Sequence, residues 1–206
     1  MERKQTEPAE TKPKRHYFVA ALLITITLMM VVIVILMSNY LVQKQTDALE
    51  DGQWLAEKYE DATRFAQNLQ AGAELMLGGA GRETEGKMLL AQAMAHSRNF
   101  ADLLAEAESR REKVRVSEAR ERYAAEMEKL HEALGATGEP AGWFASPDAA
   151  LWEAVRDAGA QMSGALQQYR LPVVDAGFRM MAAGEGWLEP ALAAAEAWAN
   201  LVNKLP

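Results

Sequence analysis

The chain has 206 residues, no cysteine and a formal net charge of −7, from 22 basic and 29 acidic side chains. This acidic balance argues against nucleic-acid binding, which depends on neutralising phosphates with Lys and Arg. Without cysteine the chain has no disulfide, thiolate metal site or catalytic thiol, and its richness in Ala, Glu, Leu and Met favours an all-α fold.

Residues 1–16 are predicted to form a short disordered tail, because charges and prolines take the place of any hydrophobic periodicity. Lys44 is the only basic residue between Ser38 and Glu57, whereas the tail has five: Arg3, Lys4, Lys12, Lys14 and Arg15. Basic residues near a membrane span favour the cytoplasmic side. We therefore expect the tail inside the cell and residues 38–206 outside.

Residues 17–37 are the most specific pattern in the sequence: 21 successive residues without a charge, a proline or a glycine. A helix of this length, at about 1.5 Å per residue, matches the roughly 30 Å hydrocarbon core of a bilayer. The stretch is longer than the ~7–15 residues of a secretory signal's apolar region, and no small-residue cleavage motif follows it. Nothing else in the chain is apolar enough to enclose it as a buried helix. We expect an uncleaved signal anchor that crosses the plasma membrane once, rather than a cleaved signal.

Residues 38–77 are predicted to continue this helix as a stalk and a first amphipathic helix. Apolar side chains recur there at three- and four-residue steps from Leu55 to Met76. In the glycine-rich segment 78–86, a G-x-G-x-x-G phosphate loop is disfavoured, because no strand precedes it and the register from Gly79 meets Thr84. A helix C-cap followed by a turn fits these glycines better.

Residues 84–134 are predicted to form a second long helix, either unbroken or divided near Val116, where Ser117 is a candidate cap. The segment 109–122 within it contains six basic and three acidic residues. We take Arg110, Arg111 and Arg115 as candidate partner-binding residues. A patch that touches anionic polymer or lipid is one interpretation, and a solvated helix face, which we favour, is the other.

Residues 135–145 are predicted to be a loop, in which Trp143 and Phe144 either cover the end of the core or anchor a partner. Three further helices are expected at 147–171, 173–183 and 190–205; Ser146 caps the first, and Val174, Phe178 and Met181 give the second its apolar pattern. Together these elements predict an extracytoplasmic bundle of four to five helices, built on a long helical hairpin.

The sequence offers no constellation for catalysis or metal binding. Glu128 and His131 have the i, i+3 spacing of di-iron bundles, but such sites need the motif twice, and Ala93 stands three residues before His96. His96 is expected to pack at a helix boundary. No G-x-S-x-G elbow is present either, so we expect no enzyme activity, no metal and no cofactor.

The pattern as a whole favours a bitopic membrane protein whose extracytoplasmic domain acts as a protein-interaction or scaffold module in a bacterial cell-envelope assembly. Besides the lipid bilayer, its partner is expected to be another protein or a second copy that pairs through the stalk; nucleic acid and small-molecule ligands are not expected. The alternative is a sensory or ligand-binding domain that signals through a partner. That alternative is weakened because such receptors need a second span and an output domain, for which a 16-residue tail has no room.

Overall fold

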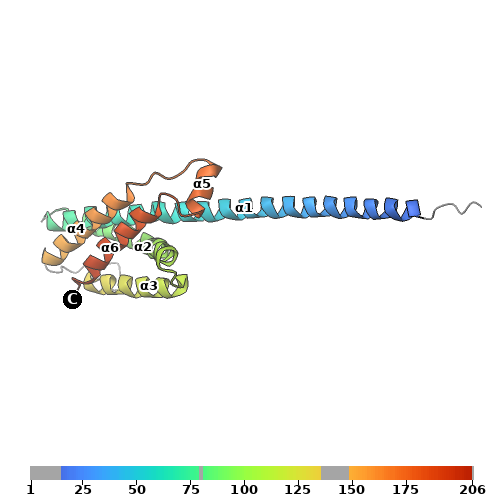
Figure 1. Cartoon of the computed structure of the whole chain (residues 1–206). Helices are drawn as coiled ribbons and strands as arrows, with labels where there is room; N and C mark the ends of the chain where they lie inside the picture. The colour runs from blue at the N-terminus through green and yellow to red at the C-terminus, as the bar shows by residue number, and fades with distance from the viewer. Residues whose placement is uncertain (1–14, 79–80, 136–148, 206) are drawn as a thin grey trace, which may run out of the picture. The chain divides into compact units, whose positions relative to one another are not determined.

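The computed structural model describes residues 15–78, 81–135 and 149–205. Within these ranges the chain is all-helical, with six helices and no strand, which confirms the predicted fold class at this level (Figure 1). The helices are α1 (Arg15–Leu77), α2 (Glu83–Glu112), α3 (Val116–Ala133), α4 (Ala149–Leu166), α5 (Asp175–Ala182) and α6 (Leu188–Val202). The chain divides into two compact units, Met1–Thr46 and Asp47–Pro206, and α1 contributes residues to both.

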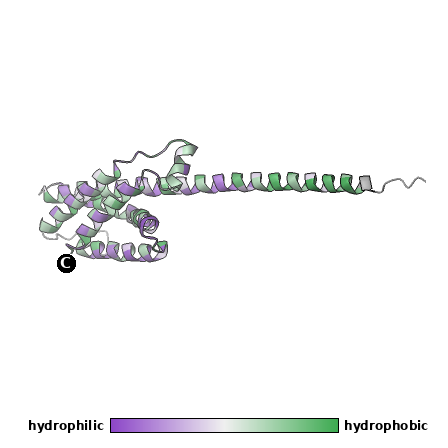
Figure 2. Ribbon diagram, in the orientation of Figure 1, coloured by the Kyte–Doolittle hydropathy of each residue, from purple (hydrophilic) through white to green (hydrophobic). Residues whose placement is uncertain are grey.

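In the first unit, α1 is a long apolar helix. Every side chain from Phe18 to Met37 is exposed, and Figure 2 shows this stretch as a nearly continuous hydrophobic segment. Its two polar side chains are satisfied inside the helix, because the hydroxyls of Thr25 and Thr27 donate to main-chain carbonyl oxygens one turn earlier, each at 2.9 Å. By length and composition, this helix is able to cross a membrane.

The second unit, residues 47–206, is held together by a hydrophobic core to which all six helices contribute. On α1 the buried hydrophobic residues follow the helical period seen in the sequence: Leu55, Ala56, Tyr59, Ala62, Phe65, Ala66, Leu69 and Ala73. At the centre the ring of Phe65 stacks on Phe100 of α2, with 4.5 Å between centroids. Trp198 of α6 meets these two rings edge-on, at 6.2 and 5.6 Å. Helices far apart in the sequence therefore meet at one aromatic cluster, where each pair adds about 0.5–1.5 kcal/mol beyond its burial.

Glycines bring α1 and α2 close together near the turn that joins them. A Cβ atom on Gly72 would lie 2.7 Å from the Leu90 side chain, and one on Gly86 would lie 3.1 Å from the carbonyl oxygen of Gly72. Larger residues at either position would push the two backbones apart. Since α1 ends at Leu77 and α2 begins at Glu83, the glycine-rich segment follows a helix and not the strand that a phosphate loop requires.

The region 84–134 contains two helices, which decides between the two alternatives left open by the sequence. α2 ends where Lys113 adopts a left-handed conformation (φ 58°) and its N–H bonds to the carbonyl oxygen of Ser109 at 3.0 Å. The Ser109 hydroxyl then donates to the carbonyl oxygen of Val114 at 2.8 Å, which secures the turn. Arg115 occupies the N-cap position of α3 without a side-chain cap bond, so Ser117 lies inside the helix and is not its cap.

The described ends of the C-terminal helices differ from the expected positions by one to five residues. α4 ends at Leu166, five residues before the expected boundary at 171, and the expected cap at Ser146 lies outside the described residues. The hydroxyl of Tyr59 donates to the Leu166 carbonyl oxygen at 2.7 Å. A side chain from α1 thus satisfies one of the carbonyl groups that a helix end leaves without an internal partner.

Candidate functional site

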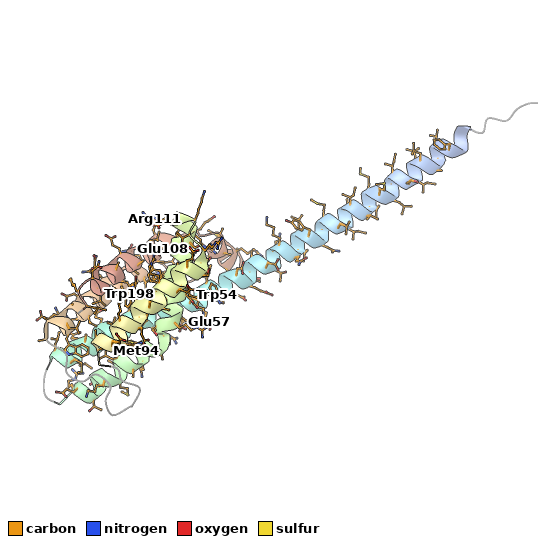
Figure 3. All side chains as sticks on the ribbon, turned by 90° about the horizontal axis from the view of Figure 1, so that it is seen from below. Trp54, Glu57, Met94, Glu108, Arg111 and Trp198 are labelled. Carbon is orange, nitrogen blue, oxygen red and sulfur yellow. The ribbon has the colours of Figure 1, made fainter. Side chains whose placement is uncertain are left out.

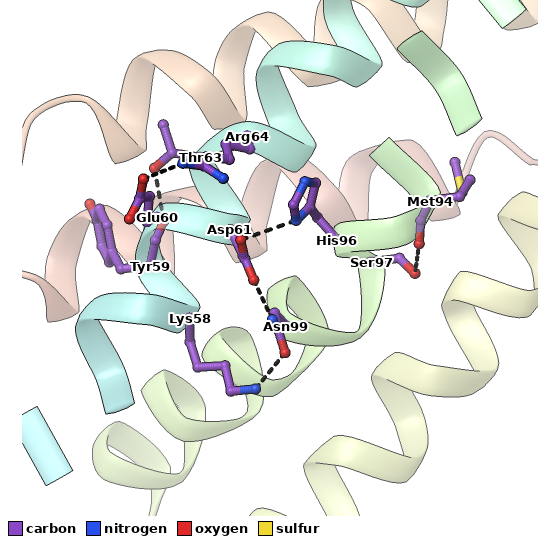
Figure 4. A network of polar contacts seen from close by, with 10 residues as sticks. All are labelled: Lys58, Tyr59, Glu60, Asp61, Thr63, Arg64, Met94, His96, Ser97 and Asn99. Carbon is purple, nitrogen blue, oxygen red and sulfur yellow. Dashed lines mark hydrogen bonds and ion pairs between the residues drawn. The ribbon is translucent and has the colours of Figure 1, made fainter. Parts of the chain in front are cut away.

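A chain of half-buried polar contacts joins α1 to α2 (Figure 4). Lys58 donates to the side-chain oxygen of Asn99, and the amide nitrogen of Asn99 donates to Asp61. The second oxygen of Asp61 lies 3.1 Å from Nδ1 of His96. Hydrogen bonds that involve charged groups are stronger than neutral ones, so these four side chains help to set how α1 and α2 align.

The same network reaches α3 through Asp102, which is only 7% exposed. The Nε atom of Arg120 lies 2.7 Å from one carboxylate oxygen, and the Nζ atom of Lys58 lies 3.7 Å from the other. A carboxylate this deeply buried needs paired cations to offset its desolvation. Asp102 therefore connects three helices.

A second cluster connects α2, α3 and α6. Arg122 donates to Glu108, and the Arg122 guanidinium lies over the Tyr123 ring at 4.8 Å. Burial raises the pKa of Glu108, but the hydrogen bonds from Arg122 and Tyr123 and the charge of Arg122 hold that pKa below its ordinary value. Glu126 accepts a hydrogen bond from Nε1 of Trp198 at 2.7 Å. These carboxylates, too, serve as ties between helices.

The three arginines predicted to bind a partner lie in different surroundings. Arg110 is engaged within the chain, because its Nε lies 2.8 Å from Glu106, its guanidinium donates to the carbonyl oxygen of Ala182 at 2.7 Å, and it covers the Trp187 ring. Arg111 projects outward from the end of α2 (Figure 3). Arg115 is also exposed, and its guanidinium lies 4.0 Å from the carboxylate of Glu118. Arg111 and Arg115 remain candidates for an external contact, whereas Arg110 contacts Ala182 and Trp187, which the sequence did not indicate.

Some of the other residues predicted from the sequence lie within the described parts of the chain and some lie outside them. Trp143 and Phe144 lie outside the described residues. The prediction that His96 packs at a helix boundary is wrong, because His96 lies well inside α2. There it faces α1, and its Nδ1 atom lies 3.1 Å from Asp61. His131 lies 3.9 Å from Glu128, but within the described ranges no three His, Asp or Glu side chains are grouped to hold a metal ion.

Among the residues that the structure describes, the second unit has two open grooves of moderate volume. One, of about 330 Å³, runs between α2 and α3 and includes Asp102, Arg120, Met127 and His131 in its lining. The other, of about 430 Å³, lies between α4 and α6. Volumes of this size are at the lower end of small-molecule sites, and the charged groups Asp102 and Arg120 already bind each other.

A further surface, around α5, was missed by the sequence analysis. Val174, Phe178 and Met181 read as one apolar pattern, but Phe178 and Met181 pack against the core while Val173, Val174 and Met180 are exposed. The sequence carried one usable signal, since Arg170 and Arg179 flank these apolar residues in an otherwise acidic domain.

No protein-family model, no curated protein and no solved structure matches the chain.

Proposed function

We propose that this protein is anchored in a membrane by residues 17–37 and presents its helical unit, residues 47–206, as a scaffold that binds another protein. The observation that carries the anchor is the exposure of every apolar side chain from Phe18 to Met37. Soluble proteins rarely expose apolar patches of more than a few hundred Å², so this stretch requires a cover. A lipid bilayer provides one of the right thickness.

The proposed orientation places the N-terminus in the cytoplasm and the helical unit outside. Its support is the excess of basic residues before the apolar stretch over those that follow it. The proposed scaffold role is supported by the polar groups of the helical unit, where the half-buried Asp61 and the buried Asp102 and Glu108 are held by side chains from other helices. These contacts connect the helices of the unit, and we propose that a partner binds on its exposed faces.

Pairing of two copies through the stalk is restricted by the fold. The apolar residues of α1 from Leu55 to Ala73 are buried in the chain's own core, so they offer no free face to a second copy. Between residues 38 and 77 the exposed large apolar residues are Tyr40, Leu41, Val42 and Trp54. A partner of the helical unit is therefore proposed to be a different protein.

The absence of cysteine allows a direct test of the anchor. Single-cysteine variants Thr6→Cys and Asn203→Cys are treated in intact cells with a membrane-impermeant maleimide. We expect labelling of Asn203→Cys at once and of Thr6→Cys only after lysis. Labelling of both in intact cells contradicts the orientation, and loss of residue 6 from the mature protein supports a cleaved signal in place of an anchor.

The partner is tested by photo-crosslinking in cells. A photoreactive amino acid replaces Trp143 or Lys129, which is exposed on α3, and Gly164 serves as the control because it faces open space on α4. A discrete protein adduct from position 143 or 129, absent from position 164, supports the scaffold proposal. If no position gives an adduct and the purified protein is stabilised by small molecules in a thermal-shift assay, the sensory alternative replaces it.

A further inference from the structure

The groove between α2 and α3, of about 330 Å³, is lined by apolar and charged side chains together. Ala101 and Met127 belong to the hydrophobic core, while Ala124 is an exposed residue on the α3 side. The carboxylate of Asp102 also lines the groove, although it is almost completely buried. A concave surface that combines apolar side chains with a few fixed polar groups has the general composition of a small-ligand site.

Asp102 holds the guanidinium of Arg120 at this groove. The Nε atom of Arg120 lies 2.7 Å from one carboxylate oxygen of Asp102, and Lys58 lies 3.7 Å from the other. The terminal nitrogens of Arg120 make no hydrogen bond to any described residue, and its side chain is 49% exposed. A guanidinium presents its donors as a planar fork that matches the two oxygens of a carboxylate. Arg120 therefore has one part tied to the fold and a second part free to bind a ligand.

Arg98 is a second source of free donors in the lining of the groove. It is exposed, and within the described ranges it forms neither an ion pair nor a hydrogen bond. The exposed acid of the lining is Glu128, whose side chain is 73% exposed and lies 3.9 Å from His131. Arg98 and Arg120 come from different helices, so the groove has unpaired guanidinium donors on both of its sides.

The local charge balance favours an anion. When Lys58 is counted with the lining, three basic side chains stand against two acidic ones: Lys58, Arg98 and Arg120 against Asp102 and Glu128. Asp61 belongs to the same polar network, but it is bound by Asn99 and His96 where α1 meets α2 (Figure 4). One negative charge is therefore missing from the groups around the groove, and a single carboxylate supplies it.

We propose that the groove between α2 and α3 binds a small organic anion that has one carboxylate and a short apolar group. The carboxylate pairs with Arg98 and with the terminal nitrogens of Arg120. The apolar group lies against the apolar lining residues: Ala101, Ala124 and Met127. Asp102 is a positioning residue, because it orients Arg120 and does not itself meet the anion. This inference goes beyond the scaffold role proposed above and does not depend on it.

The test follows the methyl group of Met127 by NMR in the full-length protein, which is held in lipid nanodiscs and carries isotope-labelled methionine methyl groups. The probe is isocaproate, a carboxylate on a short branched chain. Its matched control is isoamylamine, which has the same branched chain with an ammonium group in place of the carboxylate. Met162 is the internal control, because it is fully buried on α4 and is not part of the lining.

We expect isocaproate at millimolar concentrations to shift the Met127 signal until it saturates, while the Met162 signal stays in place and isoamylamine has no effect. Arg98→Gln removes a guanidinium that has no partner among the described residues, so the fold should tolerate it. This substitution should weaken isocaproate binding about tenfold, as expected for the loss of a charge-assisted hydrogen bond. Arg82→Gln, at an exposed arginine by the α1–α2 turn, is the control and should leave binding unchanged.

A second pair of variants tests the place of binding. Ala124→Leu adds an apolar side chain to the lining of the groove and should abolish the shift by isocaproate. Ala125→Leu makes the same change at the next position of α3, which is also exposed but is not part of the lining, and should leave the shift intact.

Each other outcome contradicts a specific part of the proposal. If isocaproate gives no saturable shift up to tens of millimolar, the groove is not a site for this class of anion. If isoamylamine shifts Met127 as strongly as isocaproate does, the groove takes up apolar groups and does not recognise a carboxylate. If Arg98→Gln binds isocaproate as the wild type does, the assignment of Arg98 is wrong. If Ala125→Leu abolishes the shift as well, binding does not take place in the groove.

Discussion

Gly52 of α1 lies directly against the backbone of Phe178 in α5. A Cβ atom at Gly52 would overlap the carbonyl oxygen of Phe178 and lie 3.0 Å from its Cα. The short helix α5 therefore rests on α1 backbone to backbone, and a glycine inside a helix is the residue that permits this approach. The same contact fixes the position of α5 on α1.

Gly52→Ala is expected to displace α5. Although alanine favours helix, the overlap with Phe178 forces one backbone to move, which destabilises the unit by about 1–3 kcal/mol. Hydrogen exchange of the full-length protein should show faster exchange over residues 175–182, with α4 unchanged. Unaltered exchange in α5 would contradict the close approach.

Gly159 and Gly164 of α4 form a matched pair. A Cβ atom on Gly159 would lie 2.8 Å from the backbone nitrogen of Gln70, whereas one on Gly164 would meet nothing within 4 Å. Gly159→Ala is expected to destabilise the unit by about 1–3 kcal/mol through overpacking, and Gly164→Ala to stabilise it by up to about 1 kcal/mol. Urea unfolding followed by circular dichroism measures both, and effects of the same sign would be inconsistent with the packing of α4 on α1.

Phe100 stands at the centre of the aromatic cluster. Phe100→Ala removes the stack with Phe65 and leaves a cavity, so we expect a loss of about 3–5 kcal/mol. Met88→Ala, an exposed position on the same helix, is expected to change the free energy of unfolding by no more than about 0.5 kcal/mol. Denaturant titration compares the two, and a small effect at Phe100 would mean that the cluster does not hold α1, α2 and α6 together.

The lowered pKa of Glu108 predicts a pH dependence of stability. A carboxyl whose folded pKa lies below its unfolded value contributes stability above the unfolded pKa and loses it as the pH falls through the folded pKa. Between about pH 5 and pH 3, the wild type should therefore lose more stability than Glu108→Gln. Thermal melts across this range test the difference. Glu128→Gln, at a side chain that is 73% exposed, is the control and should follow the wild type.

The raised pKa of Tyr59 predicts a loss of stability at alkaline pH. Burial and the neighbouring Tyr169 raise the pKa of Tyr59, so the folded state favours the neutral phenol. Its contribution is complete below the ordinary tyrosine pKa of about 10 and is lost as the pH rises beyond it. Tyr59→Phe should be less stable than the wild type by about 1 kcal/mol at neutral pH, because the bond to the Leu166 carbonyl is lost. The gap should narrow above about pH 10, and a gap that is constant with pH would contradict the burial of the hydroxyl.

Local pattern in the sequence predicted several features of the fold correctly. The periodicity of Leu55, Tyr59, Phe65 and Leu69 identified the buried face of α1, because a helix places residues three and four apart on one side. Periodicity did not explain Gly52, because a glycine inside a helical pattern only lowers helix stability. The glycine is needed for the close approach of α5, whose Phe178 lies more than a hundred residues further along the chain.

Arg110 and Arg111 also show the difference between what local sequence pattern predicts and what depends on distant contacts. They are adjacent and chemically identical in the sequence, yet Arg110 is bound to Glu106 and to the Ala182 carbonyl while Arg111 is exposed. Successive residues of a helix point in directions about 100° apart, so one faces α5 and the other faces solvent. Which of the two faces a neighbour depends on where that neighbour packs.

By itself, the sequence determined the helical character of the chain and the single apolar stretch, because both follow from composition and short-range periodicity. Only the tertiary structure decided which faces are covered, where α2 gives way to α3, and which of the apolar residues around α5 stay exposed. Those outcomes depend on contacts between segments distant in the chain, such as Gly52 with Phe178 and Arg110 with Ala182. Local propensity and periodicity carry no information about such pairings, since they report only on neighbours within a few turns.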